Sequence, residues 1–237
     1  MAENKRILVA GASGVVGRQL CRLLVEDGWQ VTGTTRSSDK ASALRAIGVA
    51  PAIVDVFDEA ALRQVTMEAQ ADIVIHQLTD LPPALDPARM PEARIRNARI
   101  RELGTRNLVA AALAAGAKRM IAQSIAFAYA PGPLPYHEEW PLSVDAPAVA
   151  SLEQQVLQAP LVGIVLRYGK FYGPGTGFDA PPTGGPLHVD AAADAARRAV
   201  TRGSAGIYNI AEDDGTVSSR RAAIELGWDP NFRIIAP

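Results

Sequence analysis

The sequence holds one cysteine, Cys21, and three histidines among its 237 residues. One cysteine cannot form an internal disulfide, and so few Cys and His side chains predict that the protein holds no metal cluster. Aromatic residues make up 5% of the chain, so we expect Leu, Ile, Val and Ala to fill the core. These scarcities argue against disulfide-stapled and zinc-dependent folds.

The chain also lacks an excess of charge of either sign. It has 24 Lys and Arg against 25 Asp and Glu, a formal net charge of −1. Nucleic acids and anionic membranes attract basic surfaces, so we expect neither as a partner. No apolar run reaches the ~18 residues that span a bilayer, and the four apolar residues after Arg6 are too few for a signal peptide. We therefore expect a cytoplasmic protein.

What the sequence does contain is an alternation of short Ile- and Val-rich runs with segments of helical periodicity. This alternation is typical of a parallel sheet with helices on both faces. The predicted strands are Arg6–Ala10, Gln30–Thr35, Ala52–Val56, Asp72–Gln77, Arg119–Gln123, Val162–Arg167 and Gly206–Ile210. The predicted helices are Val15–Asp27, Asp39–Ile47, Asp58–Glu68, Met90–Ala115, Ala146–Gln158 and Asp190–Thr201. We predict an α/β fold in one domain, residues 1–237: a doubly wound parallel sheet (Rossmann fold) with strand order 3-2-1-4-5-6.

Three glycines follow the first predicted strand and run into the start of the first predicted helix, in the segment Gly11-Ala-Ser-Gly14-Val-Val-Gly17. In this context they allow a tight turn, the approach of a pyrophosphate and close packing of the helix on the sheet. A purely structural turn is the alternative. The predicted cofactor contacts of this turn are Gly11, Ser13, Gly14, Val15, Val16 and Gly17.

The end of the second predicted strand indicates which dinucleotide binds. NAD-binding proteins place Asp or Glu there, to accept a hydrogen bond from the ribose 2′-hydroxyl. This chain instead has Thr34-Thr35-Arg36-Ser37-Ser38, and an arginine flanked by hydroxyls suits a 2′-phosphate. We predict NADP as the cofactor, with Arg36 binding its 2′-phosphate. NAD is the alternative cofactor, and an arginine exposed to solvent is the alternative interpretation of Arg36. Asp55 accepts from the adenine amino group or caps the next helix.

With these residues in hand, the chain resembles the extended and atypical branch of the short-chain dehydrogenase/reductase superfamily, the NAD(P)-dependent epimerase/dehydratases. The matching segments run almost end to end: Gly11–Gly17, Asp55, Ala71–His76, Gly104–Leu108, Lys118–Ser124, Leu166–Thr176 and Leu187–Asp190. The resemblance implies that the cofactor lies along the carboxyl ends of the strands, with Val56, Gln77, Leu78 and Thr79 at its site. It also implies a homodimer through the helices near residues 90–115 and 146–158.

The proton-transfer pair of that family, Tyr-x-x-x-Lys, is missing, because no tyrosine of this chain has lysine four places later. Asp145 and Val149 occupy the aligned positions. We predict that Ser124, Tyr129 or Asp145 supplies the acid–base chemistry, and that Tyr168 and Lys170 contact the substrate. Each of these residues has an alternative interpretation. Ser124 is then an ordinary serine at the end of a strand, Tyr129 a packed tyrosine and Lys170 a solvated lysine. We expect His76 to be a buried, hydrogen-bonded histidine and His188 to be structural.

The C-terminal substrate lobe is short beside that of the family. We expect it to be reduced to a flap formed by residues 173–187 and 211–237, which favours a small substrate. The predicted function is an NADP-dependent oxidoreductase or epimerase-like enzyme acting on a small carbonyl or hydroxyl compound with non-standard acid–base residues. The alternative is a non-catalytic NADP-binding sensor or partner-binding module.

Overall fold

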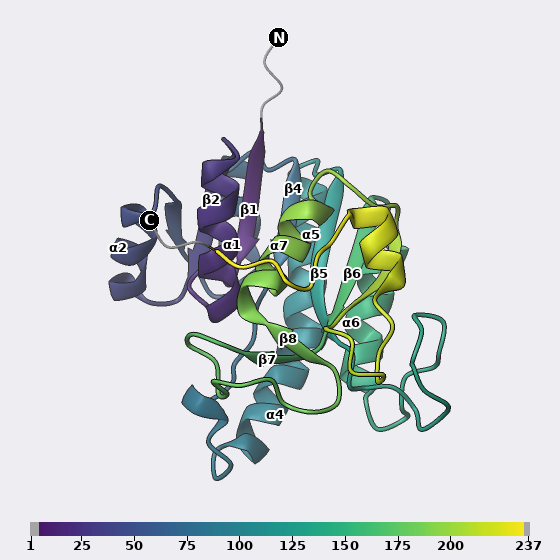
Figure 1. The fold of residues 1–237 in the computed structure, drawn as a ribbon. Helices are drawn as coiled ribbons and strands as arrows, with labels where there is room; N and C mark the ends of the chain where they lie inside the picture. Colours follow the sequence, from purple (N-terminus) through teal and green to yellow (C-terminus); the bar gives the residue numbers. More distant parts are fainter. Residues whose placement is uncertain (1–4, 235–237) are drawn as a thin grey trace.

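Seven parallel strands form the central sheet, in the order β3-β2-β1-β4-β5-β6-β9 (Figure 1). The computed structural model describes residues 5–234. The strands are β1 (Arg6–Ala10), β2 (Gln30–Thr35), β3 (Ala50–Ile53), β4 (Ile73–His76), β5 (Arg119–Ile125), β6 (Val162–Tyr168) and β9 (Gly206–Ile210). Every neighbouring pair is parallel. The predicted doubly wound sheet is confirmed, with a seventh strand beyond β6.

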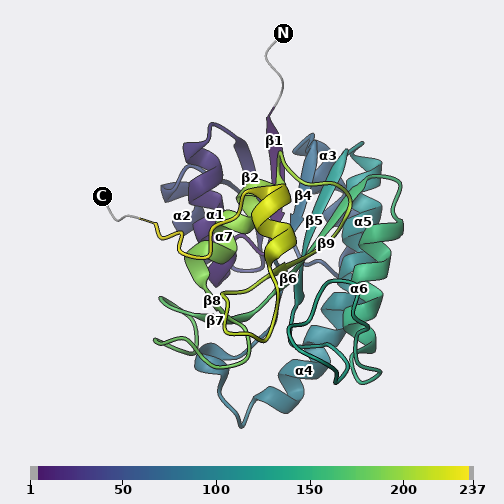
Figure 2. The same ribbon diagram turned by 45° about the vertical axis from the view of Figure 1, so that its right-hand side comes forward.

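Helices cover both faces of the sheet (Figure 2). One face carries α1 (Val15–Glu26) packed on α7 (Val189–Ala199), and the other carries α3 (Glu59–Glu68), α5 (Thr105–Ala114) and α6 (Pro147–Gln158). Helix α2 (Ser38–Ala46) packs against the β2 and β3 edge. Two aliphatic cores result, one on each face, so burial on both sides explains the continuous apolar runs of the strands.

The helix predicted over residues 90–115 is interrupted. Helix α4 (Met90–Arg99) is followed by a π-helical turn at Ile100–Gly104, labelled η2, before α5 begins. The Thr105 hydroxyl lies 3.5 Å from the carbonyl of Ile100 and 3.1 Å from Nε2 of His76 on β4. This long-range contact explains why local periodicity missed the interruption. The predicted dimer through α5 and α6 stays a prediction.

His76 is fully enclosed beside that turn. Its Nδ1 accepts a hydrogen bond from the Leu78 N–H at 3.2 Å, so Nε2 carries the ring proton and donates it to Thr105. Burial, reinforced by the nearby Arg101 charge, lowers the pKa of His76 to about 4. The ring is therefore neutral at physiological pH, as we expected of a buried structural histidine.

Beyond the main sheet, a small parallel pair is formed by β7 (Lys170–Tyr172) and β8 (Pro186–His188), with the loop of residues 173–185 between them. Neither strand was predicted, because three residues are too few to show a period. The other missed elements are the short helices η1 (Pro83–Leu85) and η3 (Ala222–Leu226). The third strand also differs, since it runs over 50–53 rather than 52–56.

The C-terminal segment is divided between the lobe and the core. Ala222, Leu226 and Trp228 are buried in the core on the α1 and α7 face, and the Trp228 indole N–H donates to the carbonyl of Ala191 at 2.8 Å. Residues 222–228 of the predicted flap thus contribute to the core, while residues 235–237 lie outside the described residues. No helix within residues 5–234 is long and apolar enough to cross a membrane.

Candidate functional site

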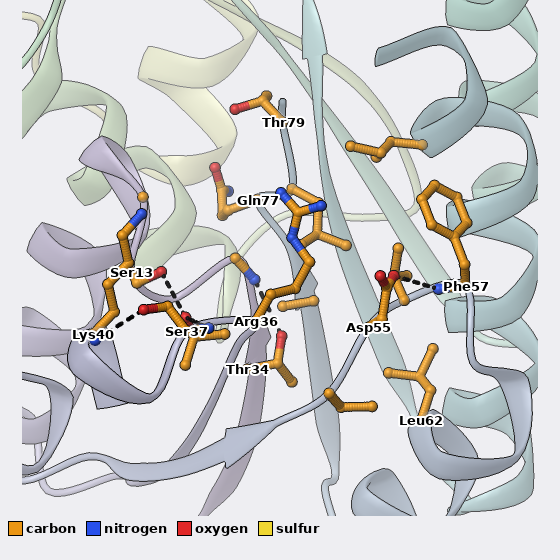
Figure 3. A pocket seen from close by; sticks show the side chains of 18 residues that line it. Ser13, Thr34, Arg36, Ser37, Lys40, Asp55, Phe57, Leu62, Gln77 and Thr79 are labelled. Carbon is orange, nitrogen blue, oxygen red and sulfur yellow. Dashed lines mark hydrogen bonds between the residues drawn. The ribbon is translucent and has the colours of Figure 1, made fainter. Parts of the chain in front are cut away.

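A cavity of about 260 Å³ opens at the carboxyl ends of β1, β2 and β4 (Figure 3). Its walls include nine of the predicted cofactor residues: Gly11, Ser13, Gly14, Arg36, Asp55, Val56, Gln77, Leu78 and Thr79. Thr34, Thr35 and Ser37, the hydroxyl residues that flank Arg36, also line it. Other wall residues were not predicted from the sequence, namely Lys40, Phe57, Leu62 and Ile100. Val15, Val16 and Gly17 lie in the adjoining first turn of α1 and do not border the cavity.

The glycine turn forms the floor of this cavity. Gly11 has a φ of +85°, and a Cβ there would lie 2.6 Å from the Gln77 carbonyl oxygen. A Cβ on Gly17 would lie 2.2 Å from the Gly11 carbonyl oxygen, so Gly17 allows α1 to pack on the turn. The free N–H groups at the start of α1 favour an anion. This open cradle fits the pyrophosphate of a dinucleotide.

The backbone conformation at Gly14 does not itself require glycine. Its φ of −74° is open to any residue, and a Cβ there would lie 3.2 Å from the Gly11 carbonyl oxygen, a tight contact that needs a shift of a few tenths of an ångström. We predict that Gly14→Val weakens dinucleotide binding at least about tenfold, because the side chain fills the cradle. Isothermal titration measures the loss, and a thermal melt checks folding. Arg22→Ala, at an exposed position later in α1 that does not border the cavity, is the control. Unchanged binding in a folded Gly14→Val protein would mean that the glycines only make a turn.

Positive charge and hydroxyl groups gather at the end of β2. Figure 3 shows Ser13, Ser37 and Lys40 together on one side of the cavity. The Ser13 and Thr35 hydroxyls are 3.2 Å apart, and Ser37 begins α2 by accepting from the Lys40 N–H at 3.4 Å. The Arg36 side chain is 59% exposed and lies 3.6 Å from the Asp80 carboxylate. Lys40 follows Arg36 by four residues, a spacing that could have indicated a second cation at this site.

Asp55 lies on the opposite side of the cavity, with Phe57 (Figure 3). Its carboxylate accepts a hydrogen bond from the Phe57 N–H at 2.9 Å. Helix α3 is capped by Asp58, which accepts from the Ala61 N–H at 3.0 Å. The helix-cap interpretation of Asp55 is therefore wrong. Asp55 borders the cavity, and its contact with the adenine amino group stays a prediction.

Two of the three predicted proton donors, Ser124 and Tyr129, are engaged in a buried polar cluster next to β5 and β6. Ser124 donates to Glu153 at 2.6 Å, and Glu153 forms an ion pair with Arg167 at 2.7 Å. Tyr129 donates to Asn209 at 2.6 Å, with its ring centroid 4.8 Å from the Arg167 guanidinium carbon. Burial raises the pKa of the Tyr129 phenol. Both hydroxyl protons are thus bound by protein acceptors.

The other predicted site residues lie apart from one another. Asp145 is exposed and hydrogen-bonds Ser143, and the Lys170 ammonium donates to the Thr183 carbonyl at 2.8 Å. Tyr168 is completely buried and donates to the Ala192 carbonyl at 3.1 Å; burial raises its pKa. Ser124, Tyr129, Asp145, Tyr168 and Lys170 do not border the cavity, and their catalytic and substrate roles stay predictions.

Comparisons with known proteins agree with this geometry. The profile of the NAD dependent epimerase/dehydratase family matches residues 7–184. A 3-diazoavenalumate denitrifying reductase from a Streptomyces species is 40% identical over 256 aligned residues, which cover 96% of this chain and 80% of that protein.

Solved structures show the same fold. The UDP-glucose 4-epimerase of Thermotoga maritima, with UDP-glucose, has a TM-score of 0.77 at 19% identity, over 96% of this chain and 94% of that chain. The UDP-glucose 4-epimerase of Thermus thermophilus, with NAD, has a TM-score of 0.70 at 22% identity, over 95% and 84%. The glycine cradle, the family profile and the reductase relative lead to one conclusion. The chain belongs to the NAD dependent epimerase/dehydratase family and is an NAD(P)-dependent enzyme.

Proposed function

We propose that this enzyme is an NADP-dependent reductase that acts on a small substrate by hydride transfer alone, with organic diazonium ions as the substrate class. One observation carries the proposal: Ser124, Tyr129 and Tyr168 each donate their hydroxyl proton to an acceptor within the protein. The family's Tyr-x-x-x-Lys pair is also missing from the sequence. A reaction that takes no proton from the protein fits this arrangement.

The substrate class follows from which hydride acceptors also need a proton to complete their reduction. When bound, NADPH supplies a hydride. A carbonyl carbon that receives a hydride leaves an alkoxide, which must then be protonated. A diazonium ion, R–N₂⁺, that receives a hydride yields R–H and N₂ and takes up no proton. The charges balance because NADPH leaves as NADP⁺.

The Streptomyces relative supports this choice. It is named for a diazo substrate and for a reduction that removes nitrogen, and it aligns with nearly the whole of this chain. The alternative is that Ser124, Tyr129 or Asp145 donates a proton to a carbonyl oxygen. That alternative requires one of these groups to leave its present partner and reach the substrate.

NADP is the preferred cofactor in this proposal. The walls of the cavity at the end of β2 and the start of α2 are Thr34, Thr35, Arg36, Ser37 and Lys40, with two cations and no carboxylate among them. A 2′-phosphate would gain charge-assisted hydrogen bonds from the arginine and attraction from the lysine. A ribose 2′-hydroxyl would find no acidic acceptor there.

A turnover assay with labelled cofactor tests the proposal. The purified enzyme is given NADPH carrying deuterium at both C4 positions, with a panel of aryl diazonium salts and of aldehydes and ketones. We expect N₂ release and deuterium on the carbon that held the nitrogen. Ser124→Ala, Tyr129→Phe and Asp145→Asn should each change this turnover by less than about threefold. Reduction of carbonyls alone, with at least a tenfold loss in any of these three variants, would overturn the hydride-only mechanism and favour the proton-donor alternative.

A further inference from the structure

Gln77 is the first residue after β4, and its backbone fixes it against the glycine turn. Its N–H donates to the Ala10 carbonyl at 2.8 Å, continuing the pairing of β4 with β1. Its carbonyl lies so near Gly11 that a Cβ on that glycine would be 2.6 Å away. The residue is 4% exposed and borders the cavity, with its side chain near that of Thr79 (Figure 3). The backbone of Gln77 is thus fixed in the cavity wall.

The orientation of the Gln77 amide follows from its one hydrogen bond. Nε2 lies 3.4 Å from the Tyr168 hydroxyl oxygen, and that hydroxyl lies 3.1 Å from the Ala192 carbonyl. A phenol has a single proton, which Tyr168 gives to Ala192, so its oxygen accepts and Gln77 must donate. Nε2 therefore faces Tyr168, and Oε1 is left for another partner.

Oε1 of Gln77 has no hydrogen-bond partner among the described residues, although the atom is buried. Two other buried amide oxygens are also unpartnered, on Gln19 and Gln155, and neither of those residues borders the cavity. A buried carbonyl oxygen without a donor is destabilising, and native proteins rarely leave one. At a cavity wall, a bound ligand can supply the missing donor.

The order of the strands indicates which part of the ligand lies at Gln77. The cations Arg36 and Lys40 are at the end of β2, the phosphate cradle at Gly11 and Gly14 follows β1, and Gln77 follows β4. In the sheet β1 lies between β2 and β4. With the adenosine half over β2 and the pyrophosphate over β1, the remaining half of the dinucleotide extends over β4.

We infer that Gln77 is a positioning residue for the cofactor, whose Oε1 accepts a hydrogen bond from the nicotinamide nucleoside half. Phosphate oxygens at neutral pH offer no proton to a carbonyl oxygen, whereas this half carries ribose hydroxyls and a carboxamide N–H. The inference rests on the proposed function in taking NADP as the ligand. The glycine turn binds the pyrophosphate in either case. The Gln77 contact is a second one, and it involves the nicotinamide half of the dinucleotide and not the adenosine half.

Binding measurements with half of the ligand test the inference. We expect Gln77→Leu and Gln77→Met to weaken NADP⁺ binding roughly fivefold by isothermal titration, because one hydrogen bond is lost. Both should leave adenosine 2′,5′-bisphosphate, which lacks the nicotinamide nucleoside, within about twofold of wild type. Arg36→Ala is the matched control and should weaken both ligands. Thermal melts verify that at least one of the two Gln77 variants folds.

A third ligand identifies the donor. In the nicotinic acid analogue of NADP⁺ a carboxylate replaces the carboxamide. If the carboxamide is the donor, wild type binds the analogue less tightly than NADP⁺, and Gln77→Leu causes no further loss. If a ribose hydroxyl is the donor, Gln77→Leu weakens both dinucleotides equally. Either result supports the inference.

The inference is wrong if the folded Gln77 variants bind NADP⁺ as wild type does, or if they lose affinity for NADP⁺ and the bisphosphate equally. Wild-type protein that binds neither NADP⁺ nor the bisphosphate would overturn the proposed cofactor, and the inference with it.

Discussion

Replacing Arg36 with alanine should weaken NADP⁺ binding by about 10- to 150-fold while changing NAD⁺ binding by no more than about twofold. The lost interaction is a charge-assisted hydrogen bond to the 2′-phosphate, worth about 1.5–3 kcal/mol. Arg36 is 59% exposed, so solvent screening favours the lower half of that range. NAD⁺ has no phosphate at this position and therefore has little to lose.

Titration of both dinucleotides into wild type and variants measures the effect. Lys40→Ala should cost less than Arg36→Ala, because an ammonium is a point charge and cannot bind a phosphate through two parallel hydrogen bonds. Arg45→Ala is the matched control, since Arg45 is an exposed arginine in the last turn of α2 and does not border the cavity. Equal affinity of the wild type for NAD⁺ and NADP⁺ would show that Arg36 does not select the cofactor.

Raising the salt concentration provides an independent measurement. The Arg36 contact is largely exposed, so its contribution should shrink as the Debye length falls from about 10 Å at 0.1 M salt to about 3 Å at 1 M. The ratio of NADP⁺ to NAD⁺ affinity in wild type should fall with it. In Arg36→Ala the ratio should depend only weakly on salt, through Lys40. A salt-independent ratio in wild type would contradict an electrostatic origin.

Local signals were enough to predict the sheet and the phosphate cradle. The glycine turn and the Ile- and Val-rich strands depend on residues close together in sequence, and the structure has them close to where local patterns indicate. Contacts between distant residues were not predictable in this way. At the end of the π-helical turn Thr105 meets His76 across 29 residues, and the hydrogen bond of the Tyr129 hydroxyl depends on Asn209, 80 residues later.

The cofactor half of the site was also easier to predict than the catalytic half, for a physical reason. A phosphate cradle consists of backbone groups at a turn, so its sequence signature is local. Proton transfer depends on where single side chains point and on which partners hold them. Ser124 leaves β5 as predicted, but Glu153 on α6 determines what its hydroxyl contacts. That pairing cannot be inferred from the spacing of residues.

Glu153→Ala should lower the free energy of unfolding by about 3–5 kcal/mol, the largest stability change expected of any single substitution considered for this protein. Glu153 and Arg167 are 4% and 3% exposed, and the guanidinium makes two hydrogen bonds to the carboxylate, at 2.7 and 2.9 Å. Removing the carboxylate leaves the arginine charge buried without its partner, and removes the acceptor of the Ser124 hydroxyl. Urea denaturation followed by circular dichroism measures the loss.

Two controls separate the effect of burying the ion pair from the effect of losing a charge. Glu92→Ala breaks an ion pair with Arg96 on α4 in which the Glu92 side chain is 85% exposed, and it should cost no more than about 0.5 kcal/mol. The double variant Glu153→Leu with Arg167→Met removes both buried charges and should recover much of the loss, because an apolar pair of similar size needs no charge partner. If Glu153→Ala were no more destabilising than Glu92→Ala, the ion pair would have to be open to water. Ser124 and Tyr129 would then lie in a solvated cluster, free to donate protons, and the hydride-only mechanism would lose its structural basis.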